Sequence, residues 1–411
     1  MPLVILLKKC IIGYSYGVSF PITIVILDYW LKECGVTNST IGLFSLFHLP
    51  FALKLLFAPI IDRYKIPYLS KKIGHRCSWV LVSQCALITG IMCMAQSDPK
   101  SNILQLMCFA SITALADGFQ NIALYPYQIS DITKEQFGYT AGIVSFGHRI
   151  GSISIKVATL YCAHFWGWKI AYECAACMVL CCMISIFFMK EPVITDDFKE
   201  SNKKNIHALS SPIKEILKEI KHVANKRYIM LTLILYKATD FTIQKMSRVF
   251  CLDIGFSKLE IANIVQFFGS IAVVAGGFLA GFFIKKYGTL YSMMIISMMH
   301  MCFLFSYIIL NYVGNDTNIL CAIIFLEGVS GGAVSAAFIA FLYENCRNGS
   351  QYALLWAIHE LSGTVFRFLS GFLADQFSWN TFFILTPLLS VPGILLLRKM
   401  IKIKNELNTN L

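Results

Sequence analysis

The chain has 411 residues, of which 57% are hydrophobic and only 14% are charged, and its mean hydropathy is +0.65. Because a soluble domain carries about 25% charged residues, this composition excludes an ordinary soluble protein and predicts one that is surrounded mostly by lipid. The net charge of +12 does not indicate a nucleic-acid-binding protein, since the basic residues recur in short loops rather than on one polar segment.

Apolar runs of a length that crosses a bilayer, about 20 residues, recur along the whole chain. They predict an all-α polytopic membrane protein with about 12 transmembrane helices. The expected spans lie near residues 9–31, 39–60, 78–97, 102–127, 138–163, 169–189, 227–250, 259–283, 289–312, 318–343, 351–373 and 380–400. Membrane lipid is therefore an expected partner along most of the surface.

Basic residues are distributed unevenly over the loops between these spans. Lys and Arg collect in cytoplasmic loops. With the N-terminus inside, every second loop is cytoplasmic, and these are the basic loops. The expected inside segments contain Lys8, Lys9, the cluster at 62–76, Lys134, Lys285, Lys286, Arg347, Arg398, Lys399, Lys402 and Lys404. The expected outside loops hold little beyond Lys32, Lys100, Lys169 and Lys258. We therefore predict that both termini are cytoplasmic.

One long polar segment, residues 190–226, separates the sixth span from the seventh. Its stretch SSPIKEILKEIKHVAN predicts a short amphipathic helix, either on the membrane interface or in a solvated linker. Two six-helix halves joined in this way are typical of transporters that are built from two repeats. The predicted parts are an N-terminal bundle at 1–189, a cytoplasmic linker at 190–226, a C-terminal bundle at 227–401 and a cytoplasmic tail at 402–411.

Ionisable residues inside the spans are candidates for function, because each costs several kcal/mol in lipid unless it is paired or hydrated. The mid-span set is Lys54, Asp117, Arg149, Lys156, Lys237, Asp240, Glu327, Glu360 and Arg367. Others lie near span ends, where a side chain is expected to reach the hydrated layer. This second set, which we leave out, is Asp28, Glu173, Lys245, Arg248 and Asp375.

Two pairs of opposite charge have helical spacing. Lys237 and Asp240 are three residues apart and therefore share a helical face, and Glu360 and Arg367 are two turns apart. Each pair is either a structural ion pair or a coupling device, because a carboxylate binds a proton more readily once its cation moves away. The proton-coupling candidates are Asp240, Glu327, Asp117 and Glu360.

Enzymatic chemistry is not predicted. The sequence contains no G-x-S-x-G, H-E-x-x-H or P-loop pattern, and its eight histidines are dispersed. We therefore expect no catalytic residue, no metal site and no cofactor.

Several stretches resemble the AmpG-type muropeptide permeases of the major facilitator superfamily. They are spread over nearly the whole chain in the expected order. These stretches are IGLFSLFHLPFALKLLFAPIIDRY at 41–64, GWKIAY at 167–172, LYKATD at 235–240, GFSKLEI at 255–261, FLEGVSGGAVSAAFIAFLYENC at 325–346 and SQYALLWAIHELSGTVFRFLSG at 350–371. The resemblance implies a major facilitator fold and proton-coupled import of anhydro-muropeptides, for peptidoglycan recycling, through the bacterial inner membrane.

The resemblance also implies where the substrate would bind. In major facilitators the first, fourth, seventh and tenth helices line a central cavity, and the Asp62–Arg63 loop would gate its cytoplasmic side. An excess of cations suits an anionic amino-sugar peptide, and tyrosines can stack on sugar faces. The substrate-binding candidates are Lys54, Arg149, Lys156, Lys237, Arg367, Gln120, Asn121, Tyr125, Gln128, Tyr14 and Tyr236. We expect a monomer.

The fourth helix departs from the family pattern. The family typically shows Gln-Asp-Ile-x-Ile-Asp-Ala-Tyr-Arg, whereas this chain reads Gln-Asn-Ile-Ala-Leu-Tyr-Pro-Tyr-Gln at 120–128, so both acids and the arginine are neutral. Our hypothesis is that Asp117, one turn earlier, replaces a lost acid. Pro126 predicts a kink or an early helix end. Two alternatives stay open: a transporter of a nucleotide-like or acyl-CoA solute, and a diverged sensor or scaffold that transports nothing.

Overall fold

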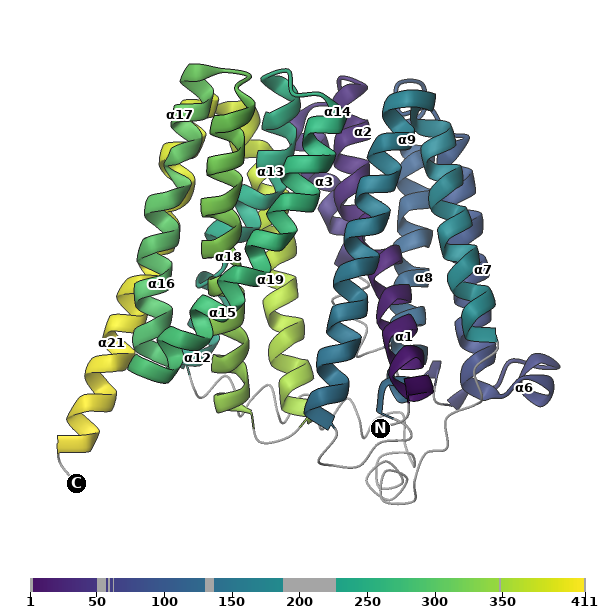
Figure 1. The fold of residues 1–411 in the computed structure, drawn as a ribbon, viewed down its shortest axis with the longest axis horizontal. Coiled ribbons are helices and arrows are strands. Elements are labelled where there is room, and N and C mark those ends of the chain that lie inside the picture. Colours follow the sequence, from purple (N-terminus) through teal and green to yellow (C-terminus); the bar gives the residue numbers. More distant parts are fainter. Residues whose placement is uncertain are drawn as a thin grey trace. The chain divides into compact units, whose positions relative to one another are not determined.

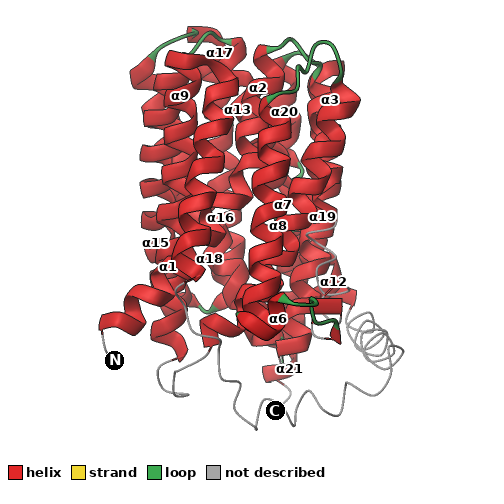
Figure 2. Ribbon diagram, turned by 90° about the vertical axis from the view of Figure 1, so that its right-hand side faces the viewer, coloured by secondary structure: helices red, strands yellow, loops and turns green. Residues whose placement is uncertain are grey.

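The computed structural model describes residues 3–49, 57, 60, 61, 63–129, 137–187, 227–346 and 349–409. All regular secondary structure in these ranges is helical, as the sequence predicts (Figure 2). The predicted linker at 190–226, with its amphipathic helix, lies outside the described residues, and so do Lys54 and Asp62.

The chain divides into two compact units, which we call unit 1 (Met1–Gly35 with Phe47–Glu215) and unit 2 (Val36–Leu46 with Ile216–Leu411). The helices of unit 1 are α1 (Leu3–Pro21), the π-helix η1 (Ile22–Ile26), α2 (Leu27–Glu33), α6 (Leu69–Lys72), α7 (His75–Ala95), α8 (Ile103–Ile129) and α9 (Phe137–Phe187) (Figure 1). Gly167 interrupts α9 with φ 83° and ψ 171°, so that α9 contains both the fifth and the sixth predicted span.

Unit 2 begins with α3 (Asn38–Leu43), which is followed by the 3₁₀ helix η2 (Phe44–His48). Its other helices are α12 (Arg227–Leu235), α13 (Ala238–Asp253), α14 (Lys258–Glu260), the π-helix η4 (Ile261–Phe268), α15 (Gly269–Tyr287), α16 (Thr289–Leu304), α17 (Ser306–Val313), α18 (Thr317–Asn345), α19 (Gly349–Gln376), α20 (Trp379–Leu388) and α21 (Ser390–Thr409). Asp375 of α19 fixes the start of α3, because its carboxylate accepts the backbone N–H groups of Asn38 and Ser39 at 3.1 and 2.6 Å.

The predicted spans coincide with these helices, although only the first part of the second span is described. Among the described residues, eight helices are long and apolar enough to cross a membrane, and α9 accounts for two spans. The seventh and eleventh predicted spans are helical but do not meet that standard. The seventh is broken between α12 and α13, and α19 carries several charged side chains.

Local structure repeats between the two halves of the sequence. Gly35 and Gly255 both have positive φ, 79° and 99°, and in each case the residue two positions later caps the next helix, Thr37 for α3 and Ser257 for α14. In both halves, a tryptophan at the start of the sixth span of that half also bonds an acidic residue at the end of its first span. In one half the indole N–H of Trp168 donates to Glu33, and in the other Trp379 donates to Asp253.

Glycines bring helix backbones into contact at several places. A Cβ at Gly13 of α1 would lie 2.1 Å from the Val144 carbonyl oxygen of α9, and one at Gly276 of α15 would lie 2.0 Å from the Val329 carbonyl oxygen of α18. Close packing through small residues is typical of membrane helices. At Gly277 and Gly281 of α15, by contrast, no atom lies within 4 Å of the position that a Cβ would take.

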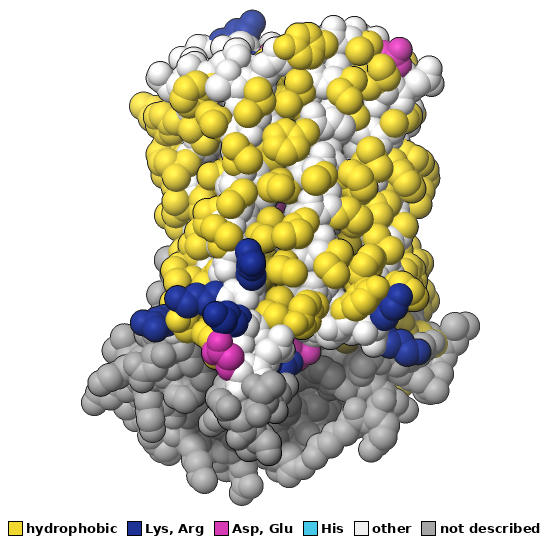
Figure 3. Space-filling view, turned by 90° about the vertical axis from the view of Figure 1, so that its left-hand side faces the viewer, with side chains coloured by type: hydrophobic (Ala, Val, Ile, Leu, Met, Phe, Trp, Pro, Cys, Tyr) yellow, Lys and Arg dark blue, Asp and Glu magenta, His cyan; other side chains and the backbone are white. Residues whose placement is uncertain are grey.

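Large apolar side chains cover the outer surface. Phe278 and Tyr312 are 78% and 76% exposed, which is what contact with lipid requires. Figure 3 shows one such face, where hydrophobic side chains extend over most of the height and Lys and Arg gather below them. An apolar surface with basic side chains toward one end is typical of a membrane protein.

Candidate functional site

A break in the seventh span places charged groups at the middle of unit 2. The helix stops at Leu235 and restarts at Ala238, with Lys237 (φ −104°, ψ 11°) preceding the new helix. Asp240 consequently occupies the first turn of α13, where the helix dipole favours a negative charge. Interrupted helices of this kind form binding sites in many transporters.

Asp240 is held by three side chains within unit 2. Its Oδ2 lies 3.1 Å from Lys237 Nζ, and its Oδ1 accepts a hydrogen bond of 3.0 Å from Gln244 Nε2. Lys237 also donates to Ser335 Oγ of α18 at 3.0 Å. Asp240 is 4% exposed and Lys237 13%. The pairing that the three-residue spacing suggests is therefore present and largely shielded.

The third side chain, His300 of α16, was not found by sequence reasoning. Its Nε2 lies 3.9 Å from Asp240 Oδ1, and its Nδ1 lies 2.8 Å from Ser330 Oγ of α18. The imidazole is buried. A single histidine among apolar residues has no spacing signal, so only its contacts with Asp240 and Ser330 reveal it.

A second ion pair lies beside the first. Arg367 Nη1 is 3.7 Å from Glu360 Oε2, and the Arg367 guanidinium lies over the Phe241 ring at 4.3 Å from its centroid. Lys237 Nζ is 5.3 Å from the same centroid. Gly363 permits this packing, because a Cβ there would lie 2.6 Å from the Phe241 ring. We call Lys237, Asp240, His300, Glu360 and Arg367 the unit 2 charge cluster.

Glu327 of α18 has a separate partner. The Tyr307 hydroxyl of α17 donates to its carboxylate, and the Tyr307 ring stacks on Phe383 of α20 with centroids 4.9 Å apart. Tyr307 is fully buried. Because burial and stacking fix the Tyr307 ring, its hydroxyl group holds the Glu327 carboxylate in one position.

Unit 1 contains a hydrogen-bonded group of polar side chains around Asp117. Asp117 accepts a hydrogen bond of 2.5 Å from Ser19, while Gln84 and Gln120 both donate to Ser15 Oγ, at 3.1 and 3.3 Å. We call these five residues the unit 1 polar network. They come from the first, third and fourth spans, and all five are buried. Asn121 bonds instead to the Asp117 carbonyl oxygen of its own helix.

Three charged residues that the sequence assigned to loops or hydrated span ends are buried. Lys9 was expected in an inside loop, but α1 already begins at Leu3, and the Lys9 ammonium donates to the Tyr127 carbonyl oxygen at 2.5 Å. Its partner lies in the last turn of α8, where a cation is favourable. Asp28 and Lys245 were expected to reach the hydrated layer, yet they are 0% and 2% exposed.

The remaining candidates lie apart from these clusters. Arg149 and Tyr125 are exposed, Lys156, Gln128 and Tyr14 are half-buried, and Arg63 is exposed. The Tyr14 hydroxyl accepts a hydrogen bond from Ser154, and buried Tyr236 stacks on Phe338. The early helix end expected at Pro126 is wrong, because α8 continues to Ile129. Pro126 has no N–H to donate to the Ile122 carbonyl oxygen, but the helix continues past it.

The fold agrees with comparisons to known proteins. The model of the Major Facilitator Superfamily matches residues 10–262 and 249–410. "Putative transporter AmpG 1" of Rickettsia bellii (strain RML369-C) is 30% identical over 400 residues, covering 96% of this chain and 97% of that protein.

Two solved transporters share the fold at 12% sequence identity. A mutant of the nucleoside transporter NupG has a TM-score of 0.69, covering 96% of this chain and 99% of its own. The xylose transporter XylE of E. coli, in a partially occluded inward-open conformation, has a TM-score of 0.66 with coverage of 97% and 96%. The chain is therefore a transporter of the Major Facilitator Superfamily and belongs to its AmpG family.

Proposed function

We propose that this transporter couples proton entry to the import of an anionic amino-sugar peptide of the anhydro-muropeptide class. The proposed setting is the bacterial inner membrane, with both termini cytoplasmic and the monomer as the working unit. The observation that carries the proposal is the buried Lys237–Asp240 pair in the broken seventh span. The resemblance to AmpG-type muropeptide permeases supports the cargo.

Asp240 is the proposed coupling residue because binding of one proton to its carboxylate would change its contacts. While ionised, its carboxylate attracts Lys237 from one side and accepts Gln244 from another. Protonation removes the attraction to Lys237, whose ammonium already has a second acceptor in Ser335 of α18. Protonation of Asp240 would therefore weaken its contact with Lys237, which precedes α13. The helix is already broken there, so a rearrangement of α13 requires little unfolding.

The cations of the unit 2 charge cluster are the proposed partners of the cargo's carboxylates. Arg367 is positioned by Glu360 and by the Phe241 ring, so its planar guanidinium is already oriented. Arginine can hold a carboxylate through two parallel hydrogen bonds. Asp117 stays a second proton candidate.

The proposal is tested by uptake of labelled disaccharide anhydro-muropeptide into proteoliposomes, with and without an inward proton gradient. We expect accumulation that requires the gradient and is inhibited by excess unlabelled muropeptide. Inhibition by a nucleotide or by acyl-CoA instead would favour the alternative cargo. No uptake of any of these solutes by protein shown to be folded would favour a non-transporting role.

A further inference from the structure

We propose that Asp240 and His300 together form a single proton-binding pair, with His300 as an acceptor that faces the Asp240 carboxylate. This inference deepens the proposed function and rests on its coupling step. It starts from the Ser330 hydroxyl, which has one proton to donate. That hydroxyl bonds the Leu326 carbonyl oxygen at 2.7 Å, and a carbonyl can only accept.

The protonation state of the imidazole follows from this bond. Because Ser330 gives its proton to Leu326, it accepts from His300 Nδ1, which must carry a hydrogen. In the neutral ring Nε2 is then a bare acceptor. It has no hydrogen-bond partner among the described residues, and it faces Asp240 Oδ1 at 3.9 Å.

Two acceptors that face each other in a buried site lack one proton between them. The charged groups that act on His300 are Asp240 and Lys237, both from the segment at the start of α13, while α18 presents Ser330 and Gly331. One proton from water would bridge the imidazole and the carboxylate, raising the charge of the pair by one. No covalent bond changes, and the same proton leaves to water on the other side of the membrane.

Nitrogen NMR of histidine-labelled protein tests the pair without any substrate. The His300 signals are identified by their loss in His300→Asn. We expect the titration midpoint of Nε2 to differ between wild type and Asp240→Asn by more than about one pH unit, since a neighbouring charge shifts protonation by that much or more. Asp253→Asn, the same change at the exposed end of α13, is the control. Equal midpoints in wild type and Asp240→Asn would overturn the pair.

Transport provides a second readout. Asn at position 300 can still donate to Ser330 in place of Nδ1 but offers no counterpart of Nε2. We expect His300→Asn to lose proton-driven accumulation of labelled muropeptide while keeping exchange of labelled for unlabelled cargo. His359→Asn is the matched control, because His359 is also buried and its Nδ1 bonds the Leu233 carbonyl oxygen. Full accumulation by His300→Asn would overturn the inference, whereas no transport by wild type would contradict the proposed function alone.

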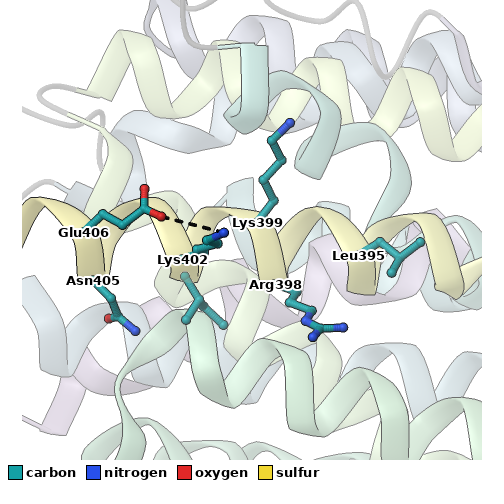
Figure 4. Close-up of a pocket in the computed structure, with 7 residues that line it drawn as sticks. Leu395, Arg398, Lys399, Lys402, Asn405 and Glu406 are labelled. Carbon is teal, nitrogen blue, oxygen red and sulfur yellow. Dashed lines mark ion pairs between the residues drawn. The ribbon is translucent and has the colours of Figure 1, made fainter.

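A separate observation at the C-terminal helix carries a second inference, that α21 binds one anionic phospholipid. Seven residues of α21 line an open groove of about 780 Å³: Leu395, Arg398, Lys399, Ile401, Lys402, Asn405 and Glu406. Figure 4 shows the basic side chains spread along the helix beyond Leu395. The one acid among the lining residues, Glu406, is paired with Lys402 at 3.9 Å, which leaves Arg398 and Lys399 for an anion.

Neighbouring helices hold this arrangement in place and add charge. Lys399 Nζ and Arg227 Cζ lie over the same Tyr228 ring of α12, at 5.5 and 5.0 Å from its centroid. Asn405 of α21 donates to the Tyr291 hydroxyl of α16 at 2.9 Å. Contacts with α12 and α16 therefore hold the basic side chains of α21 in position.

A phospholipid fits better than a soluble anion because the groove joins apolar and basic surface. Leu395, at its apolar end, is 57% exposed and would contact an acyl chain, while the basic side chains that follow along the helix would attract the headgroup phosphate. Basic pockets at the cytoplasmic ends of membrane helices bind anionic headgroups in this way. The helix thus offers an apolar contact for the acyl chain and positive charge for the headgroup.

Native mass spectrometry with phosphatidylglycerol and phosphatidylcholine tests this site. We expect wild type to retain phosphatidylglycerol selectively, and the triple variant Arg398→Gln/Lys399→Gln/Lys402→Gln to bind it roughly a hundredfold more weakly. The triple variant Lys71→Gln/Lys72→Gln/Arg76→Gln removes the same charge in unit 1 and should bind as wild type. A double variant that retains Lys402 checks that the fold survives. Equal loss in both triple variants, or full displacement by inorganic phosphate, would overturn the inference.

Discussion

At the level of single residues, the Lys237–Asp240 pair makes a clear stability prediction. Both side chains are largely shielded, so Lys237→Met leaves a buried carboxylate without its cation. Breaking a buried pair in this way costs about 3 kcal/mol or more. Unfolding of purified protein in mixed micelles measures the loss, and the double variant Lys237→Met/Asp240→Asn should recover most of it.

The matched control is Lys402→Met. Lys402 pairs with Glu406 at 3.9 Å, but the two side chains are 79% and 61% exposed. Exposed pairs contribute about 1 kcal/mol at most, so this variant should unfold almost as wild type. A loss at Lys402 as large as that at Lys237 would show that burial does not distinguish the two pairs.

Sequence reasoning located some site residues and missed others for a definite reason. The cost of a charge in lipid identified Asp240, Glu360 and Arg367, and helical spacing indicated their partners. A neutral histidine does not have the free-energy cost of a charge in lipid, so nothing in the apolar run around His300 indicated a functional residue. Lys9 was misassigned because an α-helix that begins earlier than its apolar run can bury a terminal lysine against a neighbouring carbonyl group.

At the level of elements, the contact between α15 and α18 predicts a contrast between adjacent glycines. A methyl group added by Gly276→Ala would meet backbone atoms of α18, including the Val329 carbonyl oxygen at 2.0 Å, whereas nothing lies within 4 Å at Gly277. Overpacking of this kind costs about 1–3 kcal/mol. Thermal unfolding in detergent should show a lower midpoint for Gly276→Ala and no decrease for Gly277→Ala. Equal effects would contradict the packing described for α15.

The start of α3 gives a second prediction for an element. Asp375 supplies the acceptor for the N–H groups of Asn38 and Ser39, so Asp375→Asn removes the charge that favours this helix end. We expect a cost of about 1 kcal/mol. Backbone amides of α3 should then exchange hydrogen roughly five times faster, while Asp253→Asn leaves them unchanged. Unaltered exchange in Asp375→Asn would mean that α3 does not depend on this carboxylate.

Elements were more predictable than their interruptions. Apolar length alone placed the spans, because lipid requires about 20 such residues in every crossing helix. The break before Ala238 was not predicted, since Tyr236 and Lys237 contain no glycine or proline to indicate it. Pro126 had the opposite effect: it suggested an end three residues before α8 stops.

At the level of the whole molecule, the distribution of Lys and Arg predicts the orientation. If the basic loops are cytoplasmic, the C-terminus after α21 faces the same compartment. A green fluorescent protein fused to Leu411 should fluoresce in a bacterial host, and alkaline phosphatase fused there should be inactive. The reverse pattern would contradict the assigned topology and the direction of import.

The most direct test of the central claim separates proton coupling from cargo movement. Wild type, Asp240→Asn and the control Asp253→Asn are reconstituted in proteoliposomes and assayed with labelled muropeptide for gradient-driven accumulation and for exchange without a gradient. Asn at position 240 can still accept from Gln244 but cannot bind and release a proton, so we predict exchange without accumulation. Asp253→Asn should perform both. Gradient-driven accumulation by Asp240→Asn at the wild-type level would contradict the assignment of coupling to this carboxylate.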